Sequence, residues 1–128
     1  MTIRNYRDLV AWQKAMALAE SIYKTTQQLP REERYGLVSQ MRRAAVSIPS
    51  NIAEGEGRGD DGNLLRSLRI SYGSLRELET QTLLAQRLRL LKEADTKPVF
   101  DQCHEVGRIL NGLMKTVRTR IEAKRGRP

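Results

Sequence analysis

The spacing of hydrophobic residues constrains the fold of this chain more than any other feature of its sequence. In four long segments the apolar positions recur in steps of three and four, which is the spacing of one face of an α-helix. The first series contains Leu9, Trp12, Met16, Ala19, Tyr23 and Thr26. The other three lie within residues 37–52, 63–91 and 95–121. Alternating Val, Ile and Thr residues, which would indicate strands, are scarce. The spacing therefore predicts an all-α protein.

Short joints separate the four segments, so consecutive helices are expected to pack side by side in one domain. The predicted fold is an antiparallel up-down-up-down four-helix bundle of residues 1–121, followed by a basic, disordered tail of residues 122–128. Pro49 removes one backbone hydrogen bond from the second helix and is expected to kink it. Asn5 is predicted to cap the first helix, and Asp60 or Asp61 the third.

Signals for export or membrane insertion are missing from the sequence. The N-terminal segment MTIRNYRDLVAWQK carries charge throughout and lacks the apolar run of a signal peptide. No stretch reaches the ~18 uncharged apolar residues of a membrane span. Cys103 is the single cysteine and has no second cysteine with which to form an internal disulfide. We therefore expect a cytoplasmic protein that does not contact membranes.

Residues 47–59, SIPSNIAEGEGRG, raise the question of chemistry because they combine a proline, two carboxylates and three glycines. A dinucleotide-binding loop follows a strand, whereas a helix precedes these glycines, and a Walker lysine is absent. We interpret them as a helix end and a flexible joint. His104 is the single histidine and lacks the second histidine of a zinc helix. We expect no metal, no cofactor and no catalytic residue.

A polar stripe runs along the second helix beside its apolar face. Its members, spaced by three or four residues, are Gln40, Arg43, Ser47, Asn51 and Glu54. Semi-buried polar groups need partners, and Glu77 on the third helix is expected to join them by pairing with Arg42 or Arg43. We interpret the set as a structural network that fixes helix register. The alternative is an acid/base enzyme site built from Glu54, Asn51 and Glu77.

Positive charge dominates the sequence and indicates a polyanionic partner. Lys and Arg number 23 against 15 Asp and Glu, which leaves a formal net charge of +8. Two clusters are predicted to bind RNA or DNA phosphates: Arg66, Arg69, Arg76 and Arg87, and then Lys115, Arg118, Arg120, Lys124, Arg125 and Arg127. Aromatic residues do not interleave with them, so base stacking is not indicated. The alternative is an acidic protein partner that is bound without nucleic acid.

The end of the third segment carries apolar residues on two faces. Leu84, Leu88 and Leu91 cluster away from Leu75 and Leu78 at ~100° per residue. A helix with two apolar faces usually has two partners. One alternative is a second subunit, which would make these three leucines an oligomer interface, and the other is a wide core contact near the end of the bundle.

Three stretches of the sequence resemble a known family: YRDLVAWQKA at 6–15, IYKTTQQLPREERYGLVSQMRRAAVSIPSNIAEG at 22–55, and SYGSLRELETQ at 71–81. They are similar to the 23S-rRNA intervening-sequence proteins, which are bacterial four-helix bundles without an established enzymatic activity. The most specific element is the S-x-P-x-N-I-A-E-G pattern at residues 47–55.

The chain is also similar to the accessory variability determinants of diversity-generating retroelements. Those proteins are basic, pentameric four-helix barrels that bind a reverse transcriptase and nucleic acid. The resemblance therefore implies a ring-like homo-oligomer, specifically a homopentamer, with nucleic acid and a reverse transcriptase as partners. It carries over no catalytic residue.

Overall fold

The computed structural model describes residues 5–126, and every regular element in that range is helical. Four long helices form a bundle: α1 (Val10–Thr26), α2 (Leu37–Gly57), α3 (Asp61–Arg87) and α4 (Glu93–Arg125). Two short 3-10 helices, η1 (Tyr6–Asp8) and η2 (Arg31–Glu33), precede α1 and α2. The prediction of an all-α protein with four helices is confirmed. Among the helices of this range, none is both long enough and apolar enough to cross a membrane.

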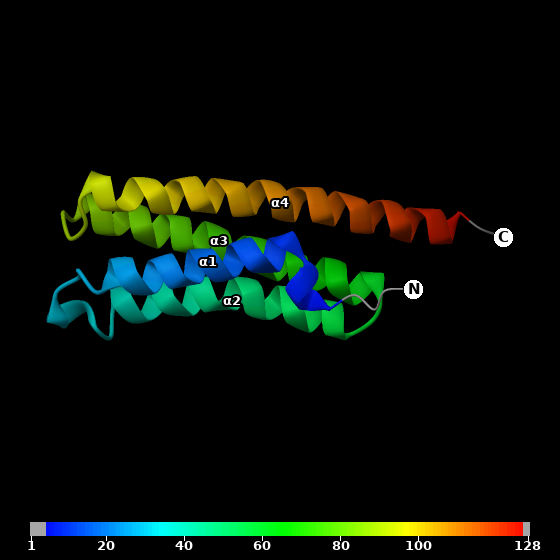
Figure 1. Ribbon diagram of the computed structural model, residues 1–128, viewed down its shortest axis with the longest axis horizontal. Coiled ribbons are helices and arrows are strands. Elements are labelled where there is room, and N and C mark those ends of the chain that lie inside the picture. The colour runs from blue at the N-terminus through cyan, green and yellow to red at the C-terminus, as the bar shows by residue number, and fades with distance from the viewer. Residues whose placement is uncertain (1–4, 127–128) are drawn as a thin grey trace.

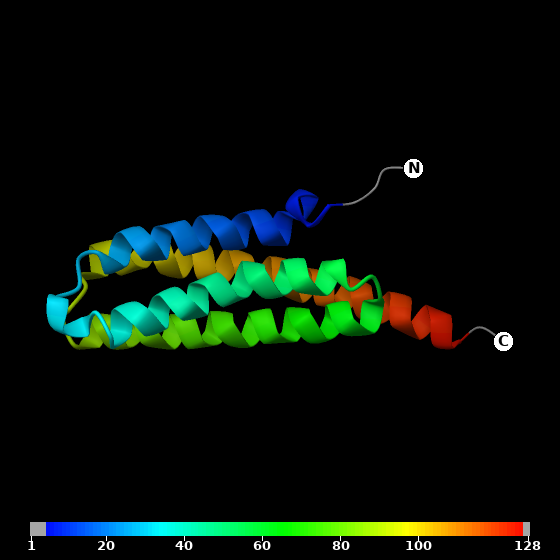
Figure 2. The same ribbon diagram turned by 90° about the horizontal axis from the view of Figure 1, so that it is seen from below.

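The joints between the helices lie at alternate ends of the bundle. The α1–α2 and α3–α4 joints share one end, and the α2–α3 joint lies at the other, close to the end of α4 (Figures 1 and 2). This arrangement places the beginning of α3 beside the second half of α4, which decides which basic residues lie near one another.

Two predicted caps are present, although one of them starts a different element. The Asp60 carboxylate accepts a hydrogen bond from the backbone N–H of Asn63 at 2.8 Å and begins α3, as expected. Asn5 forms a reciprocal cap with Asp8, but this cap begins η1 rather than α1. Leu9, whose backbone is extended, separates η1 from α1, and α1 begins at Val10.

Helix α1 buries a face that shares Ala19 and Thr26 with the predicted series but turns its largest apolar residues aside. Its core positions are Ala11, Ala15, Leu18, Ala19, Ile22 and Thr26. The distance between packed helices depends on the side chains at their contact, and alanines allow a close approach. Trp12, Met16 and Tyr23 consequently lie on the flank of α1. With Val46 and Pro49 of α2 they line a groove of about 600 Å³.

The glycine-rich stretch ends α2, as its interpretation as a helix end predicted. The helix includes Gly57, and Gly59 then takes a positive φ of 79° that begins the joint to α3. Helix α2 continues through Pro49, and the kink expected at this residue stays a prediction. Gly55 has a different role, because a Cβ at this position would lie 2.5 Å from the Cβ of Ser67 on α3. Glycine here lets α2 and α3 pack closely.

Leu91 belongs to the core of the bundle, which corrects its predicted place beside Leu84 and Leu88 in an oligomer interface. Leu91 is 4% exposed, whereas Leu84 is 46% and Leu88 is 55% exposed. Helix α3 ends at Arg87, and Arg89 takes a left-handed φ of 61°. The N–H groups of residues 89 and 90 return to the carbonyls of residues 86 and 85, which is a Schellman motif. Helical spacing thus ceases to apply before residue 91.

Helix α4 continues into the segment for which a disordered tail was expected. It ends at Arg125, so residues 122–125 are helical, and residues 127–128 lie outside the described residues. Lys124 contacts the Asp61 carboxylate of α3 at 3.5 Å. The N–H of Gly126 donates to the Glu122 carbonyl at 3.0 Å. The end of α4 therefore contacts α3 in addition to forming its own backbone hydrogen bonds.

Candidate functional site

The predicted polar network forms only at its centre. The hydroxyl oxygens of Ser47 on α2 and Ser74 on α3 lie 2.8 Å apart in a direct hydrogen bond. The Asn51 side-chain N–H donates to the Ser47 carbonyl at 2.8 Å and to its hydroxyl at 3.0 Å. These three side chains join α2 to α3 at one level of the bundle.

The remaining predicted members do not join this network. Glu54 pairs instead with Arg58, the residue that follows the end of α2, at 2.9 Å. Gln40, Arg43 and Glu77 line a surface hollow of about 390 Å³ together with Gln81. Within residues 5–126 these side chains form no hydrogen bond or ion pair with one another, and the buried side-chain oxygen of Gln81 has no hydrogen-bond partner.

Arg42, one of the two predicted partners of Glu77, is engaged with α1 instead. Its guanidinium points to α1, where it donates to the Thr26 hydroxyl at 2.9 Å and to the Tyr23 carbonyl at 3.3 Å. It also lies 4.5 Å from the centre of the Tyr23 ring, within range of a cation–π interaction. The arginine therefore ties α2 to α1 and not to α3.

Three of the ten predicted phosphate-binding residues are paired with carboxylates. Arg120 donates two hydrogen bonds to Asp61, at 2.9 Å and 3.3 Å, and Lys124 contacts the same carboxylate. The hydrogen bond from Arg120 lowers the pKa of Asp61 below the usual value for a carboxyl group. Arg76 is paired with Glu79 at 3.0 Å, which raises the pKa of the guanidinium. These three cations are partly neutralised.

The other predicted basic residues, with the exception of Arg127, are exposed and have no carboxylate partner within residues 5–126: Arg66, Arg69, Arg87, Lys115, Arg118 and Arg125. Arg127 lies outside the described residues. The Asp61–Arg120 contact brings the start of α3 beside the second half of α4. Arg66 and Arg69 are therefore at the same end of the bundle as Lys115, Arg118 and Arg125. Arg87 lies at the opposite end of α3.

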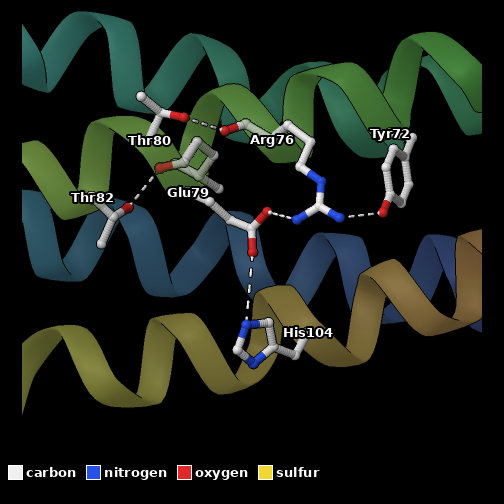
Figure 3. A network of polar contacts seen from close by, with 7 residues as sticks. Tyr72, Arg76, Glu79, Thr80, Thr82 and His104 are labelled. Atoms are coloured by element: carbon white, nitrogen blue, oxygen red, sulfur yellow. Dashed lines mark hydrogen bonds and ion pairs between the residues drawn. The ribbon is translucent and has the colours of Figure 1, made fainter.

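A cleft between α3 and α4 contains polar side chains that are joined by hydrogen bonds and ion pairs (Figure 3). The Arg76 guanidinium bridges the Glu79 carboxylate at 3.0 Å and the Tyr72 hydroxyl at 2.6 Å. From α4, Nε2 of His104 lies 3.9 Å from the second oxygen of Glu79. The cleft measures about 290 Å³. Burial raises the pKa of the Cys103 thiol beside it to about 12, so this sulfur is protonated and unreactive at neutral pH.

Arg108 also lines this cleft and was not among the predicted basic residues. The sequence holds a signal for it, because four exposed residues, His104, Arg108, Asn111 and Lys115, follow one another in steps of four, three and four. Such spacing places them on one face of α4. Within residues 5–126, the structure groups no three His, Cys, Asp or Glu side chains in a way that would hold a metal ion.

Comparisons with known proteins relate this chain to one family and one fold. A family model described as 23S rRNA-intervening sequence protein matches residues 7–112. The chain is also similar to a crystal structure of a protein of unknown function from the S23 ribosomal protein family of Bacteroides thetaiotaomicron. That similarity has a TM-score of 0.77 at 21% identity and covers 83% of this chain and 96% of the other, which shows a shared fold. None of the curated proteins compared with this chain matches it.

Proposed function

The chain belongs to the family of 23S rRNA-intervening sequence proteins, and from this premise we propose a non-enzymatic protein that binds RNA or DNA through phosphates. The observation that carries the proposal is that Arg66, Arg69, Lys115 and Arg118, from α3 and α4, lie toward the same end of the bundle, where Arg66 lines a hollow with Glu54 and Arg58. These four exposed cations of α3 and α4 have no carboxylate partner within residues 5–126. Lys and Arg side chains that neutralise phosphates release counterions and bind without reading base sequence.

We expect the double variant Arg66→Glu with Arg69→Glu to bind a short labelled RNA about tenfold or more weaker at low salt. The slope of log affinity against log salt should also become shallower by about 1 for each lost phosphate contact. Fluorescence anisotropy across a salt series measures both quantities. Both side chains are exposed, so the fold should persist, and circular dichroism checks this.

Arg87→Glu serves as the matched control, because it makes the same change on the same helix at the opposite end of the bundle. We expect it to weaken binding much less than the double variant, after allowance for one reversed charge instead of two. A wild-type protein that retains no RNA at physiological salt, or an affinity that does not depend on salt, would contradict the proposed function.

Self-assembly is the second part of the proposal and is supported by the exposure of Leu84 on the last turn of α3 and of Leu88, which follows its end. We expect the double variant Leu84→Asp with Leu88→Asp to reduce the assembly to smaller species, because a buried carboxylate disfavours an apolar interface. Light scattering coupled to chromatography measures the mass. Leu83→Asp is the control, since Leu83 is similarly exposed but is rotated by about 100° from Leu84. A wild-type monomer would exclude this part.

The similarity to accessory variability determinants supplies the finer expectations of a ring of five chains and a reverse-transcriptase partner. A measured mass of five chains would support the first of these. Co-purification of the reverse transcriptase after nuclease treatment would support the second, and a different mass or no retained enzyme would contradict each in turn.

A further inference from the structure

Donor groups from α4 lie along one wall of the cleft between α3 and α4. His104, Arg108 and Asn111 all line it, and they present imidazole, guanidinium and carboxamide nitrogens on one face of the helix. All three residues are exposed. The same stripe continues to Lys115 and Arg118, so the cleft leads directly into the basic end of the bundle.

The opposite wall carries one carboxylate whose charge is already compensated. The Glu79 side chain is 16% exposed and is held at 3.0 Å by Arg76, which is in turn fixed by the Tyr72 hydroxyl (Figure 3). Because Arg76 and Glu79 cancel, the net charge of the cleft comes from Arg108 and from the protonation state of His104. The Cys103 thiol contributes no charge at neutral pH.

His104 is placed where its protonation would change what the cleft attracts. Its Nε2 lies 3.9 Å from Glu79, and its ring is one helical turn from Arg108. The other charged groups near it on α4 are engaged elsewhere, Glu105 with Lys14 of α1 and Asp101 with Lys97. Protonation therefore raises the net charge of the cleft from about +1 to about +2, counted from Arg76, Glu79, His104 and Arg108.

We infer that this cleft holds one phosphate group of the bound nucleic acid, between Arg108 and His104, and that protonation of His104 strengthens the contact. The inference rests on the proposed function and adds a specific site and a pH dependence to it. Charge-assisted hydrogen bonds to phosphate are stronger than neutral ones, so affinity rises as His104 becomes protonated.

The affinity of the untagged protein for a short rhodamine-labelled oligouridylate should increase about 3- to 10-fold from pH ~7.5 to pH ~5.5. Uracil does not titrate in this range, so the RNA itself keeps its charge. His104→Gln should abolish the increase, so that the affinity of this variant is the same at both pH values. Arg108→Gln should weaken binding at both pH values and keep the increase. Both side chains are exposed, and circular dichroism verifies the fold at each pH.

A second readout uses the fact that the chain contains one histidine and therefore gives one imidazole Hε1 signal in a proton NMR spectrum. By reciprocal linkage, saturating RNA should raise the midpoint of its titration by about 0.5 to 1 pH unit, the logarithm of the fold-change above. A histidine with a purely structural role would keep its midpoint.

Three results would overturn the inference while leaving the proposed function intact: an equal pH response in His104→Gln, an imidazole midpoint that RNA does not move, or an equal shift caused by inorganic phosphate at matched ionic strength. The last result would assign the cleft to free phosphate. Absence of RNA binding at every pH would instead reject the proposed function itself.

Discussion

Leu91→Ala is expected to lower the free energy of unfolding by about 2–5 kcal/mol. Leu91 is 4% exposed and packs in the core just after the turn that ends α3. Removal of its side chain takes apolar surface out of the core and leaves a cavity that the rigid helix ends cannot fill. Chemical denaturation followed by circular dichroism measures the change.

Leu88→Ala is the matched control, because it removes the same atoms three residues earlier in the chain. Leu88 is 55% exposed, so its replacement should change the unfolding free energy of the subunit by less than about 1 kcal/mol. The two variants should be compared at a protein concentration where their masses agree, because loss of assembly also alters apparent stability. A larger effect at position 88 than at position 91 would show that α3 does not end as described.

Gly55→Ala is expected to destabilise the bundle by about 1–3 kcal/mol through overpacking. The added Cβ would lie 2.5 Å from the Cβ of Ser67, 2.9 Å from its hydroxyl oxygen and 3.4 Å from the Cα of Leu64. The first and last of these atoms belong to or adjoin the α3 backbone, so relief requires α2 and α3 to move apart. A thermal or urea unfolding curve measures the loss.

Gly57→Ala provides the control for this substitution on the same helix. A Cβ at Gly57 would meet no neighbouring atom within 4 Å, and alanine favours helix over glycine by up to about 1 kcal/mol. We therefore expect unchanged or slightly raised stability. Equal destabilisation by the two substitutions would point to a requirement for flexibility in this stretch instead of close packing at Gly55.

Substitutions at the residues proposed to bind phosphate can separate effects on RNA binding from effects on folding. Arg66, Arg69, Arg108 and Lys115 are all exposed, so their replacement removes charge without opening the core. Substitutions at Gly55 and Leu91 act in the opposite way, on packing alone. A loss of RNA affinity in the first group with unchanged unfolding curves would therefore report on the interface.

Local sequence was sufficient for the helical class, for a cap of α3 at Asp60 or Asp61, and for the helix end at the glycines. Each of these features depends on interactions between residues close together in the chain, such as the hydrogen bond from Asn63 to Asp60. The family also followed from the sequence, since its most specific motif is a continuous stretch of nine residues at 47–55.

Tertiary structure decided which of several similar residues are buried, paired or free. Periodicity gives the angular position of a residue on a helix, but it holds only while the helix continues, and the left-handed backbone of Arg89 turns Leu91 into the core. Whether a basic side chain on the surface is neutralised by a carboxylate depends likewise on the packing of the helices. Asp61 is about sixty residues from Arg120 in the chain and 2.9 Å from it in space, so only the packing of α3 against α4 shows which cations remain available to a polyanion.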